Sequence, residues 1–196
     1  MMTDRAAIDR LNELGACSEA IEWCRGREAA WDACERGDWM LWLCGRLAGP
    51  PGSDSRKPLV LAACECARLS LHLVPAGEDR PRRAIETAEA WCRGEATLDQ
   101  VRRAATAAAT AAGWAAGWAA ADAAAAAAAD AAYAAAAAAA DWAPDAAAAA
   151  AADAAAAAVA AFVADAAFAS TLKQCADIVR RHYPTCPLLT EVTSDD

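Results

Sequence analysis

The sequence predicts an all-α protein: a small helical bundle with a long alanine-rich helical hairpin. In the first hundred residues, capping residues and glycines delimit segments of helical length. An Ala-dominated tract follows, from about residue 104 to residue 169, and Ala has the highest helix propensity of all residues. No segment alternates apolar and polar residues with the period of two that strands require, so no strand is expected.

Start and stop signals set the bounds of the predicted helices before the tract. Thr3 can cap a helix that Gly15 stops, and Ser18 can cap one that Gly26 stops. The next helices are predicted over residues 28–36, ending at Gly37 in a left-handed conformation, and over residues 39–47, capped by Asp38. After a loop, GPPGSDSRKP, further helices are predicted from Pro58 to Leu73 and from Asp79 to Gly94.

A capping box begins the long helix of the tract. In Thr97-Leu98-Asp99-Gln100, the Thr hydroxyl and the Gln amide can each accept a hydrogen bond from a free backbone N–H. We therefore expect a helix to begin there.

Helical periodicity predicts which residues are buried. The helix after Pro58 is apolar almost all round except for one stripe of Glu65, Arg68 and His72, which predicts a helix in the middle of the bundle with one exposed edge. The following helix has two faces. Its outer, salt-bridged stripe is Arg82, Glu86, Glu89 and Arg93, and its inner face is Ile85, Ala88 and Cys92.

The alanine-rich tract has one break, at residues 141–145 (DWAPD). Pro144 cannot donate a helical hydrogen bond and disfavours helical geometry at Ala143. Two arms of similar length, residues 98–141 and 144–183, predict an antiparallel hairpin, with one long helix kinked at Pro144 as the alternative. The expected organisation is a globular helical part (1–96), the Ala-rich hairpin packed on it or extending from it (97–183) and a flexible acidic tail (184–196).

Composition excludes several classes of partner. The net charge of −9 disfavours nucleic acid and anionic membrane surfaces and favours a basic protein partner. The uncharged run 104–121 consists of Ala, Thr, Gly and Trp and leads into Asp122, Asp130 and Asp141, which argues against a membrane span. The charged start of the chain has no secretory signal, so we expect a cytoplasmic protein whose nine cysteines are reduced and packed as small hydrophobic residues.

The residues that carry most enzyme and metal chemistry are sparse. Cys64 and Cys66 point to nearly opposite sides of a helix, and no C-x-x-C pair completes a tetrahedral zinc site. His72 and His182 are the only histidines, and the sequence has no phosphate-binding glycine loop, G-x-S-x-G or H-E-x-x-H motif. We expect no enzymatic activity, no catalytic residues, no metal and no cofactor; a polar site at Glu65, Arg68 and His72 is the alternative.

A partner-binding surface is predicted where charged and aromatic residues gather. Glu28, Asp32 and Glu35 have the spacing of one helix face, and Asp38 and Trp39 follow at the next helix start. An acidic face of this kind suits a basic partner, and Trp is enriched in binding hot spots. The alternative is a solvated face, with Arg36 paired to Asp32, beside tryptophans that fill the core.

Four segments resemble a known family. They are AWDACERGDWMLWLCGRL (residues 30–47), LVLAACECARLSL (59–71), RPRRAIETAEAWCRGEATLDQVRRAA (80–105) and CADIVRRHYP (175–184). Together they are similar to bacterial and phage-borne immunity proteins that share an immunity-protein-five-like domain, over roughly residues 17–184. The resemblance implies a protein that binds and neutralises the cognate toxin of a polymorphic toxin system, and it implies no catalytic residues.

The purity of the alanine tract departs from this family pattern and supports a second hypothesis. The Ala-rich helices would then serve as a spacer or as a packing surface for a homo-oligomer, with no relation to a toxin.

Overall fold

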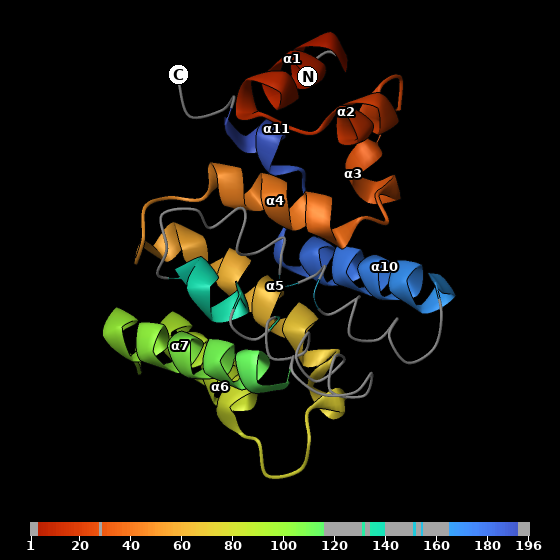
Figure 1. The fold of residues 1–196 in the computed structure, drawn as a ribbon. Coiled ribbons are helices and arrows are strands. Elements are labelled where there is room, and N and C mark those ends of the chain that lie inside the picture. Colours follow the sequence, from red (N-terminus) through yellow and green to blue (C-terminus); the bar gives the residue numbers. More distant parts are fainter. Residues whose placement is uncertain are drawn as a thin grey trace.

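The computed structural model describes residues 4–27, 29–115, 131, 134–139, 151, 154 and 165–191. Within these residues the chain forms α-helices and two short 3-10 helices, and no strand (Figure 1). The predicted all-α helical bundle is confirmed. In chain order the elements are α1 (Asp4–Leu14), α2 (Ser18–Cys24), α3 (Ala30–Ala33), α4 (Gly37–Leu47), η1 (Asp54–Arg56), α5 (Lys57–Arg68), η2 (Leu71–Leu73), α6 (Arg80–Cys92), α7 (Leu98–Ala115), α10 (Asp165–His182) and α11 (Pro187–Glu191).

Several helix boundaries follow the local signals. Gly15, Gly26 and Gly94 all have positive φ just after α1, α2 and α6. The capping box at the start of α7 also forms, because the Thr97 N–H donates to Gln100 Oε1 (2.7 Å) and the Gln100 N–H donates to Thr97 Oγ1 (3.3 Å). Local chemistry alone therefore determines where these helices begin or end.

Helix α5 lies in the middle of the bundle, as its apolar sequence predicts. It packs against α4 and α10 on one side and against α6 on the other, and α6 in turn packs against α7 (Figure 1). Leu59, Val60, Cys64 and Cys66 of α5 have no exposed surface. A second, smaller apolar cluster, Leu11, Leu14, Leu43 and Leu188, joins α1 and α11 to the opposite face of α4.

The helix predicted over residues 28–36 is wrong in length. Helix α3 is a single turn, and the chain leaves it at Cys34 with an extended backbone (ψ 124°). Arg180 of α10 explains the early end, since its Nη1 donates to the carbonyl oxygens of Trp31 (3.2 Å) and Cys34 (2.8 Å). The Trp31 Nε1 donates in turn to the Tyr183 carbonyl oxygen (3.0 Å). The two Arg180 bonds occupy carbonyls that a continuing helix would use for its own hydrogen bonds.

Gly37 is not the left-handed stop that its sequence context predicts. It is the first residue of α4 and is buried where α4 crosses α10. A Cβ atom at this position would lie 2.4 Å from Cys175 Cβ and 2.7 Å from the Ala176 backbone nitrogen. Asp38 does not cap the helix either, because it lies within the first turn and no side-chain capping bond forms. Close packing, and not a turn, requires glycine here.

The helix predicted from Pro58 to Leu73 ends early, at Arg68. The backbone tightens there, with the Leu69 N–H donating to the Cys66 carbonyl and the Ser70 N–H to the Ala67 carbonyl, before η2 begins. His72 therefore does not continue the stripe of Glu65 and Arg68. Nor does Glu89 belong to an outer stripe with Arg93, because Arg68 binds Glu89 at 2.7 Å and Arg93 binds Glu95.

The turn of the predicted hairpin, around Pro144, lies outside the described residues. The hairpin, its kinked-helix alternative, the division into 1–96, 97–183 and 184–196, and the state of the tail stay predictions. The described part of the tract is nevertheless informative. Residues 134–139 are helical and none is more than 4 % exposed, and all of them except Ala137 belong to the same apolar core as α4, α5 and α10.

Candidate protein-binding surface

The residues predicted to bind a partner differ in exposure. Asp32 in α3 and Glu35 after it are exposed. Asp38 is only 5 % exposed, and Trp39 is half-buried against the main core. Glu28 lies outside the described residues. Of the three described carboxylates, those of Asp32 and Glu35 lie at the surface and that of Asp38 lies beneath it.

Asp38 is neutralised by its neighbour Arg36. The Arg36 Nε donates to Asp38 Oδ1 at 2.8 Å and its Nη2 donates to Oδ2 at 2.5 Å, so the pair is bidentate. The same guanidinium lies 3.7 Å from Glu19 Oε1 and stacks over the Trp39 ring with its central carbon 4.2 Å from the ring centroid. Asp38 therefore fixes Arg36 in place over Trp39.

Two further residues, Trp23 and Arg27, extend this arrangement beyond the predicted surface. Trp23 of α2 meets Trp39 edge to face, with ring centroids 6.3 Å apart. Arg27 lies over the Trp23 ring at 4.8 Å and donates from Nε to the Trp23 carbonyl oxygen (2.7 Å). We name Arg27, Trp23, Trp39 and Arg36 the Trp–Arg row. The i, i+4 spacing of Trp23 and Arg27 was a usable local signal, but the contact between the two tryptophans was not.

Both signs of charge surround the row. Glu19 and Glu22 of α2 are exposed, and Glu35 lies 3.6 Å from Lys173 of α10. Lys173 is in turn 3.7 Å from Asp177. The surface around α3 is therefore a network of ion pairs with exposed carboxylates at its edge, not an unbroken acidic face.

Glu65 of α5 lies in a separate polar cluster at the end of α10. Its carboxylate accepts hydrogen bonds from Arg181 Nη2 (2.5 Å) and contacts His182 Nε2 (2.8 Å). Burial raises the pKa of Glu65, but the hydrogen bonds from His182 and Arg181 outweigh it and bring the pKa below its ordinary value. The polar site of Glu65, Arg68 and His72, which the sequence left open as an alternative, does not form, because Arg68 binds Glu89 instead.

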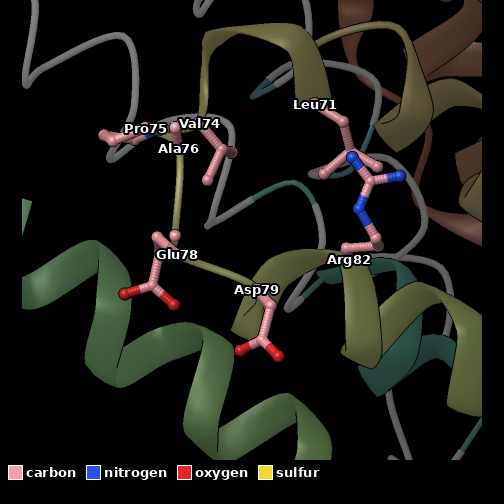
Figure 2. A pocket seen from close by; sticks show the side chains of 8 residues that line it. Leu71, Val74, Pro75, Ala76, Glu78, Asp79 and Arg82 are labelled. Carbon is pink, nitrogen blue, oxygen red and sulfur yellow. The ribbon is translucent and has the colours of Figure 1, made fainter.

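A shallow cavity of about 200 Å³ lies beside the loop between η2 and α6 (Figure 2). The Arg82 side chain extends toward Leu71, whereas the carboxylates of Glu78 and Asp79 point away from Val74 (Figure 2). Glu78 is held by Arg80, whose backbone N–H and Nε both donate to Glu78 Oε1. The lining contains no Cys, His, Ser or Lys, so it presents no nucleophile paired with a base.

Among the described residues, no group of three or more His, Cys, Asp or Glu side chains is placed to hold a metal ion. None of the described helices combines the length and apolarity needed to cross a bilayer.

Comparison with known proteins gives one family. Residues 51–132 match the family model described as Imm-5 like putative immunity protein. No curated protein matches the chain, and no solved structure does. The resemblance to immunity proteins is confirmed over this range, which runs from the loop before η1 through α5, α6 and α7. It contains the cavity but neither the Trp–Arg row nor Asp32 and Glu35.

Proposed function

We propose that this protein, whose residues 51–132 match an immunity-protein family, neutralises a cognate bacterial toxin by binding it. The family match is the observation that carries the proposal. The acidic balance of the chain, with a net charge of −9, supports a toxin with a basic contact surface. Binding, and no chemical step, is the proposed mechanism.

We place the toxin contact on the surface formed by α2, α3 and the start of α4. Exposed Asp32 and Glu35, together with Glu28, are the proposed electrostatic contacts, and the half-buried Trp39 is the proposed apolar contact. Tryptophan and arginine are the side chains most enriched in binding hot spots, and the Trp–Arg row contains two of each.

The local structure favours a rigid binding surface. The Arg180 bonds to Trp31 and Cys34 hold the short α3 segment against α10, and the Asp38 bond holds Arg36 over Trp39. A surface ordered before binding loses less conformational entropy when the partner docks. In this proposal Asp38 supports the contact through Arg36 and does not itself touch the toxin.

The alternative function, an Ala-rich spacer or oligomerisation element, finds less support. A spacer or an interface between copies needs an exposed helix face, but residues 134–139 are at most 4 % exposed and belong to the core of the bundle. A homo-oligomer built through this part of the tract would require the bundle to open.

The proposal is tested by co-expression with the candidate toxin encoded next to this gene, with bacterial growth as the measurement. Wild-type protein should restore growth. The triple variant Glu28→Lys, Asp32→Lys, Glu35→Lys should lower the association rate by about tenfold or more, because it repels a basic toxin surface, and should weaken rescue. The wild-type association rate should also fall as salt is raised.

A matched triple variant on the far side of the bundle provides the control. Glu86, Glu95 and Asp99 are also exposed carboxylates, and two of them are also paired to a neighbouring cation. Their reversal to Lys changes the net charge equally but should leave rescue intact. Loss of rescue in the control alone would move the contact to α6 and α7. Failure of the wild type to bind or neutralise the toxin would reject the function itself.

A further inference from the structure

The loop between α4 and α5 has a defined geometry. Residues 50–53 form a tight turn in which the Ser53 N–H donates to the Pro50 carbonyl oxygen (3.1 Å). Pro51 and Gly52 are the central residues, and Gly52 has a φ of +80°, as a type II turn requires. The chain then enters η1, whose last residue is Arg56. The turn and η1 together direct both the Gly52 N–H and the Arg56 side chain toward the alanine-rich tract.

Arg56 is the largest side chain in the described part of the protein with almost no exposed surface, at 2 %. Its Nε donates to the Gly49 carbonyl oxygen (2.6 Å) within the loop, and its Nη1 donates to the Ala138 carbonyl oxygen (3.3 Å). The Gly52 N–H donates to the next carbonyl, that of Ala139, at 3.4 Å. Two consecutive main-chain carbonyls of the tract are therefore bound by one loop.

Carbonyls that accept hydrogen bonds from outside a helix are typical of its last turn, where helical donors run out. The sequence predicts a helix end close by, because Pro144 has no N–H to donate to the Ala140 carbonyl and disfavours helical geometry at Ala143. Further back along a helix, the carbonyls already accept bonds from within it. The loop can therefore bind the tract well only near the end of a helix.

The tract needs a contact that fixes its position along the helix axis, because residues 134–139 are all alanine. A shift of one helical turn, about 5.4 Å, would keep methyl groups at most of these buried positions and would bring Tyr133 from one side, or Asp141 from the other, into the rest. The alanine side chains themselves therefore hardly distinguish the observed position from its neighbours, and only the residues that flank the run do so. A contact that recognises the main chain near the end of the helix does distinguish them.

We propose that loop 49–56 is a main-chain clamp, with Arg56 at its centre, that positions the alanine-rich segment within the bundle. Arginine suits this role because its planar guanidinium donates in two directions, to Gly49 in the loop and to Ala138 in the tract. A lysine ammonium at the end of a flexible chain cannot span both carbonyls with the same geometry. The clamp acts on the fold and is independent of which partner the protein binds.

Hydrogen–deuterium exchange of the full-length protein, measured peptide by peptide, tests the clamp. In Arg56→Met, which keeps an unbranched apolar side chain but removes the guanidinium donors, amides in the peptide covering residues 131–139 should exchange at least about tenfold faster. Peptides from α6 should change much less. Arg56→Lys should give an intermediate acceleration in the same peptide.

Arg68→Met is the matched control, because Arg68 also links two elements but binds Glu89 of α6 and not the tract. It should leave exchange in residues 131–139 unchanged. Equal acceleration in every peptide of Arg56→Met would show a general loss of stability and overturn the clamp. Unchanged exchange in residues 131–139 in both Arg56 variants would overturn it as well. If Arg56→Met does not fold, Arg56→Lys and the Arg68→Met control decide the question.

Discussion

At the scale of single residues, Gly37 shows how one missing side chain permits a helix crossing. Its ideal Cβ position lies 2.4 Å from Cys175 Cβ and 2.8 Å from the Cys175 carbonyl carbon. Most of the obstruction is backbone, which cannot rotate away as the end of a long side chain can. We therefore expect Gly37→Ala to lower the free energy of unfolding by about 3 kcal/mol, measured by urea denaturation.

Gly15→Ala provides the comparison for this prediction. Gly15 has a φ of +84° but nothing within 4 Å of its Cβ position, so Ala there introduces backbone strain without a clash. A cost of about 1 kcal/mol is expected. If the two variants are equally destabilised, α4 and α10 are not as closely packed as the structure places them.

Residue-scale details of the candidate surface were only partly predictable from the sequence. The exposure of Asp32 and Glu35 follows from their charge. The burial of Asp38 does not, because it depends on Arg36 folding back over Trp39 and on α10 lying beneath Gly37. Contacts between residues far apart in the chain leave no local pattern in the sequence.

At the scale of elements, local sequence signals predicted the helix ends that contacts with other helices do not change. Helices α1 and α6 end at the expected glycines, and α7 begins at the expected capping box. Helix α3 is shorter than its sequence suggests because a side chain of α10 binds its carbonyls. The bundle core was predictable from periodicity, whereas the partners of Glu65 and Arg68 required the packing of three helices.

The contact between α5 and α10 through Glu65 should make stability depend on pH. The folded-state pKa of Glu65 lies below its ordinary value of 4.5, so the ionised carboxylate stabilises the fold. This contribution is fully present above about pH 4.5 and is lost as pH falls through the lower folded-state pKa. Glu65→Gln should therefore cost about 1 kcal/mol at neutral pH, a modest value because the pair is partly exposed, and the difference from wild type should shrink in acid.

Denaturant titrations of both proteins across the acidic range measure this difference. Glu86→Gln is the control, since Glu86 is exposed on α6, and it should change stability by less than about 0.5 kcal/mol at every pH. A Glu65→Gln deficit that stays constant down to the acid limit would mean that the side chain acts through packing and not through its charge.

At the scale of the whole molecule, the nine cysteines report how the chain is packed. All nine are free thiols in this structure, and they differ in exposure. Cys17 is exposed, three are half-buried, and five are buried within the bundle. Burial raises the pKa of the thiols it affects, to about 11 for half-buried Cys92, and the thiolate is the form that reacts. Burial thus protects these thiols from reaction in two ways: it blocks the access of a reagent, and it keeps the thiol protonated.

We expect a thiol-alkylating reagent at about pH 8 to modify Cys17 first in the native protein, with the five buried thiols at least about 100-fold slower because they react only after local opening. Mass spectrometry of the labelled protein counts the modified sites. Cys17→Ser should remove the fast phase, and denaturant without reductant should expose all nine thiols.

The unfolding temperature should be the same with and without reductant, because no disulfide contributes to the fold. Fewer than nine reactive thiols in denaturant would reveal a disulfide, and rapid native labelling of the buried thiols would mean that the bundle opens far more readily than its burial implies.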